Sequence, residues 1–175
     1  MTKNNSLVLM IDNLTGFAYN VSSDNFLFLS SQDSLNVFES VFAEVKQYLR
    51  RFATEPDFLS KMQMAFGNNF TPNSVLSFSD AWAKGDFADL PQIEIRSSQE
   101  INGALGAFSK ENNRIYLAKE FVRENQSHPE IIAQVLLEEI GHFVDSRINV
   151  ADTPGDEGEF FTALVQGQTL GNGSA

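Results

Sequence analysis

Two adjacent glutamates and a histidine, in Leu137-Glu138-Glu139-Ile140-Gly141-His142, form the group of residues best suited to chemistry in this chain. Glu138 and His142 are four residues apart, so on a helix they share one face and can reach the same metal ion. Glu139 would lie to the side of that pair, where a carboxylate can take a proton from metal-bound water. The pattern differs from the zinc motif His-Glu-x-x-His at one position, because Glu138 stands where the first histidine would be. We therefore expect Glu138 and His142 to be metal ligands and Glu139 to be the general base.

The helix that must position these residues is predicted over Ser127–Asn149. Ser127-His128-Pro129-Glu130 is typical of a helix start, with Ser127 as the N-cap, Glu130 closing a capping box, and a proline in the first turn, where it is tolerated. Apolar residues lie on almost every side of this helix, which predicts that it is buried in the middle of the domain. A buried carboxylate needs a cation, a metal or several hydrogen-bond donors, or else it takes up a proton.

A third ligand is expected downstream, at Glu157. In the predicted last helix, Glu157 shares a face with Phe160, Phe161 and Leu164, so its carboxylate should point inward. Its neighbours Asp156 and Glu159 are expected to face outward or to cap the helix.

Asp145 is a further acidic residue near the expected ligands, and a di-iron site is the alternative metal site to consider. Asp145 follows His142 by three residues and is expected to support a ligand rather than bind the ion itself. A di-iron carboxylate site would need a second Glu-x-x-His motif. The chain lacks one, because the only other histidine, His128, has Asn125 three residues before it.

The charge of the expected ligand set bears on the choice of metal. Two histidines and one carboxylate leave Zn²⁺ a net positive charge that acidifies bound water. Glu138, His142 and Glu157 together would cancel that charge. We expect zinc, but such a site would also accept harder ions such as Mn²⁺ or Ca²⁺ and would be a weaker Lewis acid.

Composition limits the partners of the chain. A net charge of −11 argues against nucleic acid and anionic membranes, which favour basic surfaces, and it favours a monomer. The absence of cysteine excludes disulfides, thiolate catalysis and cysteine-based zinc sites. The apolar run Leu7–Ile11 is too short for a secretory signal or a membrane span. We expect a chain without an N-terminal signal, either cytoplasmic or exported by another route.

The order of predicted elements is helices, then a strand pair, then two helices, which indicates an α+β fold rather than a βαβ alternation. Sixteen phenylalanines among 175 residues supply a large core. We expect a single domain over 1–166, with a mainly helical part at 1–90 and the strand pair and metal-site helices at 91–166. Residues 167–175 are expected to form a flexible tail.

The individual elements follow from hydrophobic periodicity and turn residues. In the first part we expect strands at Leu7–Ile11 and Phe26–Leu29, a helix from Asp33 or Ser34 to about Phe52, a helical piece at Asp57–Phe66, and a loop-rich stretch from Gly67 to Leu90 with a short helix around Ala81–Ala83. In the second part we expect strands at Gln92–Arg96, Ala104–Phe108 and Arg114–Ala118, a turn at Lys110–Asn113, the helix Ser127–Asn149, a loop at Val150–Gly155 and a last helix to about Gln166.

Three segments together resemble the zincin-type metallopeptidase fold: Arg114–Ala118, the helix with Glu-Glu-Ile-Gly-His, and the stretch Asp152–Glu159. More narrowly, they resemble metalloprotease-like domains of large cyanobacterial calcium-binding or repeat-containing proteins. The resemblance covers about 104–167 and implies a small antiparallel or mixed sheet packed on the metal-site helix. It also implies that Arg114, Ile115, Tyr116, Leu117 and Ala118 form an edge strand above the cleft, where an extended substrate would pair with the backbone.

Three functions remain open at this point. The first is a metal-dependent peptidase acting on a peptide or protein. The second is a catalytically inactive zincin-like module that binds a partner or anchors a larger calcium-binding protein, since most active zincins have histidine where this chain has Glu138. The third is a calcium-stabilised structural module, which the acidic composition suggests.

Overall fold

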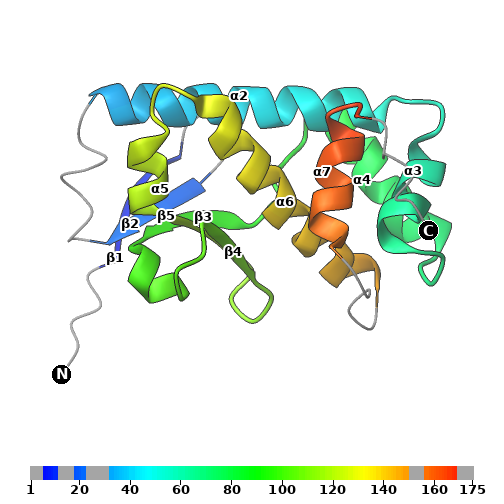
Figure 1. The fold of residues 1–175 in the computed structure, drawn as a ribbon. Coiled ribbons are helices and arrows are strands. Elements are labelled where there is room, and N and C mark those ends of the chain that lie inside the picture. The colour runs from blue at the N-terminus through cyan, green and yellow to red at the C-terminus, as the bar shows by residue number, and fades with distance from the viewer. Residues whose placement is uncertain (1–5, 12–17, 23–31, 150–155, 169–175) are drawn as a thin grey trace.

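Five strands form one mixed sheet in the computed structural model, which describes residues 6–11, 18–22, 32–149 and 156–168, with side chains described from Val37 onward. The strands are β1 (Ser6–Ile11), β2 (Ala18–Ser22), β3 (Gln92–Arg96), β4 (Gly106–Ser109) and β5 (Arg114–Ala118). Their order across the sheet is β1-β2-β3-β5-β4 (Figure 1). The pairs β2–β3 and β3–β5 are parallel, whereas β1–β2 and β4–β5 are antiparallel.

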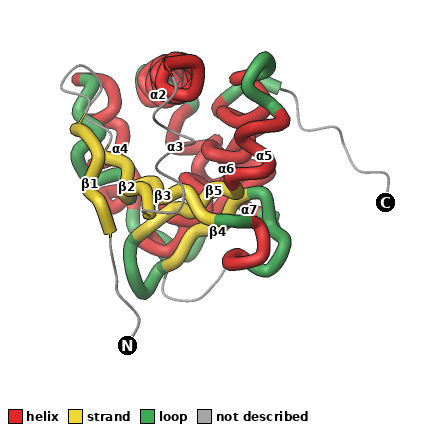
Figure 2. Tube along the Cα trace, turned by 90° about the vertical axis from the view of Figure 1, so that its left-hand side faces the viewer, coloured by secondary structure: helices red, strands yellow, loops and turns green. Residues whose placement is uncertain are grey.

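Six helices are described, together with the short 3₁₀ helix η2 (Ser98–Ile101). The helices are α2 (Gln32–Ala53), α3 (Phe58–Phe66), α4 (Pro72–Lys84), α5 (Lys119–Glu124), α6 (Pro129–Ile148) and α7 (Glu157–Val165). α2 runs along the top of the molecule in Figure 1, and α6 packs against α2, α7 and β4. Figure 2 shows α2 and α6 on the same side of the sheet. The predicted α+β class is confirmed.

Alternation along the strands determines which face of the sheet the helices cover. Ile93 and Ile95 of β3 and Ile115 and Leu117 of β5 are at most 1% exposed, as expected for strand residues that point to one face. On the opposite face, Glu94 is buried between two arginines. Along β3 and β5 the helices therefore close a core against one face, and the other face is polar.

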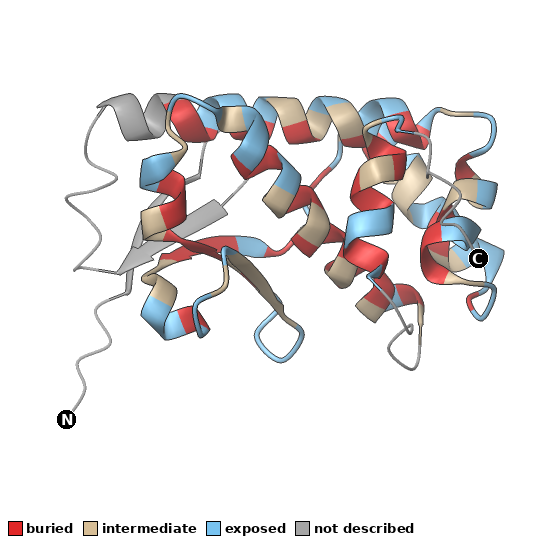
Figure 3. Cartoon of the chain, viewed as in Figure 1, coloured by how far each residue is buried: buried red, intermediate tan, exposed pale blue. Residues whose placement is uncertain are grey.

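α6 is buried along most of its length, as predicted (Figure 3). Ile132, Leu136, Ile140 and Val144 are each fully buried. Its start differs from the prediction, because the N-cap is His128 and no side chain caps the helix. Glu130 does not close a capping box with Ser127, and its Oε1 instead lies 3.0 Å from Nδ1 of His128.

The first half of the chain contains more regular structure than predicted. α4 has 13 residues, where only a short helix inside a loop was expected. Its many serines have weak helix propensity, but Pro72 starts it, Gly85 ends it at φ 77°, and Val75 and Trp82 bury one face. Packing therefore overrides local preference. β2 and α5 were not predicted at all, and the predictions for Phe26–Leu29 and Val150–Gly155 lie outside the described residues.

The predicted edge strand Arg114–Ala118 is instead an interior strand. β5 pairs with β3 on one side and with β4 on the other; for example, Ile115 lies opposite both Ile93 and Phe108. Both backbone edges of β5 are therefore used, and the prediction that a substrate pairs with this strand was wrong. β5 takes the inner place because Ile115 and Leu117 are apolar core residues, whereas β4 has the sequence Gly-Ala-Phe-Ser and is only partly buried. The edge strand on this side of the sheet is β4, and β1 forms the other edge.

Phe161 joins the helical layers around α7, and its replacement should test the core. Its ring lies 5.8 Å from that of Phe52 and 5.5 Å from that of Phe66, and the side chain is fully buried. Phe161→Ala should therefore lower the free energy of unfolding by about 3–5 kcal/mol in urea titrations. The matched control is Phe160→Ala, because Phe160 is 45% exposed. It should cost less than about 1 kcal/mol, and equal losses in the two variants would contradict this packing.

Candidate metal site

The candidate site is built where α6 and α7 approach each other most closely. A Cβ placed on Gly141 would lie 2.8 Å from the Cα of Gly158. A Cβ placed on Gly158 would lie 2.8 Å from both the carbonyl oxygen of Glu138 and Nε2 of His142. These two glycines let the backbones meet, so the first turn of α7 lies directly against the predicted ligands of α6.

Glu138, His142 and Asp156 come together at this junction. Each offers one ligand atom, and the three atoms all lie within 4.8 Å of one another. Glu138 and His142 are half-buried, and Asp156 is exposed. Burial raises the pKa of Glu138 above its usual value, and the nearby charge of Asp156 adds to that effect, while His142 opposes it. Two carboxylates and an imidazole form a donor set suited to a divalent cation.

Asp156 was expected to face outward or to cap the last helix, and it is both exposed and the N-cap. It is the N-cap of α7, and its Oδ1 accepts a hydrogen bond from the backbone N–H of Glu159 at 3.3 Å. The sequence reasoning missed it as a candidate ligand. A usable signal was present, since Asp156 precedes Gly158 by two residues and a glycine at that position permits close contact with α6.

Glu157 points inward, as the apolar pattern of α7 predicted. Its side chain is buried, and its Oε1 lies 3.4 Å from Nδ1 of His142. Its Oε2 is buried and has no hydrogen-bond partner among the described residues. Glu157 thus lies next to the Nδ1 side of the predicted ligand His142. The group of three residues whose ligand atoms lie within 4.8 Å contains Asp156 and not Glu157.

Glu139 lies beneath β4 and outside the group of three candidate ligands. A Cβ on Gly106 would come within 2.9 Å of Oε1 of Glu139, and the glutamate accepts a hydrogen bond from the backbone N–H of Phe108. Burial raises the pKa of Glu139 to about 7. The nearby His142 and the hydrogen bond from Phe108 both act in the opposite direction and limit the rise. A carboxylate with such a pKa can both accept and release a proton near neutral pH.

Asp145 is buried at the C-terminal part of α6. Its Oδ1 accepts a hydrogen bond from Nδ2 of Asn149 at 2.7 Å, and the same amide group donates to the carbonyl of Phe66 at 3.1 Å. Asp145 therefore helps to hold the end of α6 against α3. Support of His142 by this residue stays a prediction.

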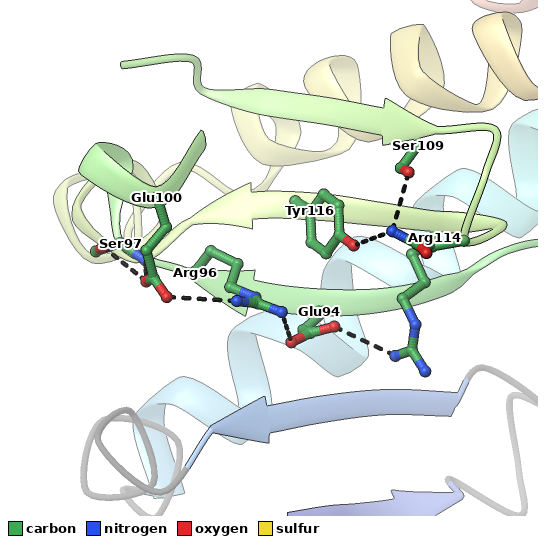
Figure 4. A network of polar contacts seen from close by, with 8 residues as sticks. Glu94, Arg96, Ser97, Glu100, Ser109, Arg114 and Tyr116 are labelled. Carbon is green, nitrogen blue, oxygen red and sulfur yellow. Dashed lines mark hydrogen bonds and ion pairs between the residues drawn. The ribbon is translucent and has the colours of Figure 1, made fainter. Parts of the chain in front are cut away.

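The five residues of the predicted substrate strand do not gather at the site. Ile115, Leu117 and Ala118 are buried core residues of β5. Arg114 pairs with Glu94 at 3.2 Å, and the Tyr116 hydroxyl accepts a hydrogen bond from Asn112 (Figure 4). Both side chains therefore belong to the polar face of the sheet.

Comparison with known proteins identifies no relative: no family model, curated protein or solved structure matches the chain. Among the described residues, no helix has the length and apolar character needed to cross a membrane. The function must therefore be inferred from the residues of the site.

Replacing Gly158 tests whether the close approach of the helices positions the site. In Gly158→Ala the new methyl group would meet Glu138 and His142, at a cost of about 1–3 kcal/mol that exceeds the gain of about 1 kcal/mol in helix propensity. Urea titration should therefore show a less stable protein. Glu159→Ala, on the exposed side of the same turn, should change stability by less than about 0.5 kcal/mol. A stabilised Gly158→Ala variant would rule out the tight junction.

The raised pKa of Glu139 predicts how stability depends on pH in metal-free protein. An unfolded glutamate ionises near its usual 4.5, but folded Glu139 holds its proton to about 7. The folded state therefore binds more protons between these values, and the free energy of unfolding should fall as pH rises, by about 3 kcal/mol at most. Urea titrations with a chelator present should show this fall in the unaltered protein and a smaller one in Glu139→Gln. The exposed Glu130→Gln variant should keep the full dependence, and identical curves for all three proteins would refute the assignment.

Proposed function

We propose that this chain is a zincin-like, metal-dependent peptidase whose metal is bound by Glu138, His142 and Asp156. The observation that carries the proposal is the convergence of these three side chains within 4.8 Å at the junction of α6 and α7. Glu138 and His142 are one helical turn apart, and Asp156 comes from the start of the helix that packs on them.

Glu157 has a distinct part in this proposal. An imidazole that donates its Nδ1–H to Glu157 keeps the lone pair of Nε2 for a metal, and the contact fixes the orientation of the ring. The distance of 3.4 Å between Nδ1 and Oε1 is consistent with that role. The free Oε2 of Glu157 leaves open the direct ligation expected from the sequence.

The donor set fits a divalent ion. One imidazole and two carboxylates match the ligands of zinc, and they also suit harder ions such as manganese or calcium. A bound ion of this kind would polarise a carbonyl and acidify a coordinated water. Because the two carboxylates offset the charge of the ion, this acidification should be weaker than in a site with two histidines.

Glu139 is the proposed general base. It adjoins Glu138 in sequence, is buried beneath β4, and has a pKa near 7, which suits proton transfer at neutral pH.

A substrate path beside Glu139 is provided by the edge strand β4. The carbonyl of Leu105 accepts a hydrogen bond from Ala118, so the alternating antiparallel pattern turns the backbone groups of Gly106 and Phe108 toward the free edge. Glu139 accepts a hydrogen bond from the N–H of Phe108 at that edge. An extended peptide added to β4 would therefore take over this N–H from Glu139 and lie beside the carboxylate of the proposed base.

A binding module without catalytic activity is the second candidate. Glu138 favours it, because a carboxylate in place of a histidine makes the bound metal a weaker Lewis acid. The edge of β4 could hold a partner strand without any hydrolysis.

Metal titration tests the ligand set that both candidates share. Isothermal calorimetry on dialysed protein should show one Zn²⁺ site, and Glu138→Gln, His142→Gln or Asp156→Asn should each weaken it at least tenfold. Glu157→Gln should weaken it by about 10–100-fold, as expected for a residue that orients a ligand. The control is Glu159→Gln, which removes a nearby charge from the exposed side of α7 and should keep most of the affinity. Equal loss in all variants, or no binding at all, would refute the site.

Hydrolysis of a mixed peptide library by the zinc-loaded protein then separates the two candidates. A peptidase should cleave the library, and Glu139→Gln should bind zinc but lose at least about 100-fold of the activity. Zinc binding without cleavage that depends on Glu139 would favour the binding module.

A further inference from the structure

A cavity of about 770 Å³ lies away from the metal site, among α4, the segment 86–92, the turn before β5 and the C-terminal end of α6. Glu138, His142 and Asp156 do not line it. Its volume falls in the range of sites that bind small molecules, about 300–1,000 Å³. The chemistry of its walls therefore indicates what class of molecule could bind there.

The floor of this cavity is aromatic. Phe78, Trp82 and Phe143 line it, and the ring centre of Phe78 lies 5.2 Å from that of Trp82 and 6.1 Å from that of Phe143. Trp82 and Phe143 are almost completely buried, so they offer a ligand almost no surface and instead hold the half-buried ring of Phe78 in place. A fixed aromatic surface of this kind favours an aromatic or large apolar group.

One wall carries a positive charge. Arg147 of α6 stacks over the ring of Phe143 at 5.2 Å and donates a hydrogen bond to Oδ1 of Asn113 at 3.1 Å. Among the described residues, no carboxylate lies within ion-pair distance of Arg147. Arg114, on the same wall, is paired with Glu94 at 3.2 Å. Arg147 is thus a positioned guanidinium whose charge is available to an anion.

Other lining residues limit the charge of the ligand. Asp86 and Asp89 are exposed lining residues from the segment after α4, and Oδ1 of Asp86 accepts a hydrogen bond from the N–H of Ala88. Their negative charge disfavours a dianion such as a phosphate monoester. A single carboxylate at the Arg147 wall is compatible with them.

We propose that this cavity binds a small organic monocarboxylate with an aromatic or large apolar body. The carboxylate pairs with Arg147, and the body lies on Phe78, whose ring Trp82 and Phe143 hold in place. Amino acids blocked at the amino group, and short peptides ending in an aromatic residue, belong to this class. The proposal does not depend on metal at Glu138, His142 and Asp156.

Trp82 is the only tryptophan in the chain, and it reports directly on this cavity. Tryptophan fluorescence of the full chain should change saturably when N-acetyl-L-phenylalanine is added. N-acetyl-L-phenylalaninamide has the same body without the carboxylate, and it should bind about tenfold more weakly or not at all. An equal response to both compounds, or no response to either at millimolar concentrations, would overturn the proposal.

Variants of Arg147 test whether this residue binds the carboxylate of the ligand. Arg147→Gln should weaken binding of the acid by about tenfold and leave any residual binding of the amide unchanged. Arg147→Lys keeps the charge and should retain more affinity than Arg147→Gln. Arg123→Gln is the matched control, since Arg123 is exposed on α5 and does not line the cavity. If Arg147→Gln binds the acid as well as Arg123→Gln does, the proposal is wrong.

Discussion

The contact between Gly141 and Gly158 is the constraint on which the candidate site depends. Helix backbones usually stay well apart because side chains lie between them, with axes about 8–10 Å from each other. Here the glycines remove the side chains, and the start of α7 meets Glu138 and His142 directly. Asp156 and Glu157 both lie close to the histidine: Asp156 is a candidate ligand beside it, and Oε1 of Glu157 is 3.4 Å from its Nδ1. Without this approach Asp156 would lie apart from Glu138 and His142, which share one face of α6.

Burial of α6 has consequences beyond packing. The helix places Glu139 in a region of low polarity, which raises its pKa to about 7, while Glu138 stays half-buried at the junction with α7. Two consecutive glutamates therefore have different surroundings, because successive helical residues point about 100° apart. One is available to a metal and the other lies under the backbone of β4.

The sequence predicted those parts of the fold that local patterns determine. The strands at Gln92–Arg96 and Arg114–Ala118, the long helix before Pro56 and the inward direction of Glu157 follow from periodicity alone. The order of strands does not, because pairing between β3 and β5 joins segments separated along the chain. Asp156 was missed as a candidate ligand for a similar reason: a capping residue becomes a neighbour of His142 only through the packing of two helices.

The outer edge of β4, which pairs with no described strand, also bears on self-association of the chain. An unpaired strand edge can template the addition of a strand from another molecule and so begin aggregation. Here the carboxylate of Glu139 accepts a hydrogen bond from the outward N–H of Phe108 at that edge. A neighbouring copy would have to displace this hydrogen bond before it could pair with β4. Glu139, the residue proposed to act on a peptide, thus also makes the addition of a second copy to β4 less favourable.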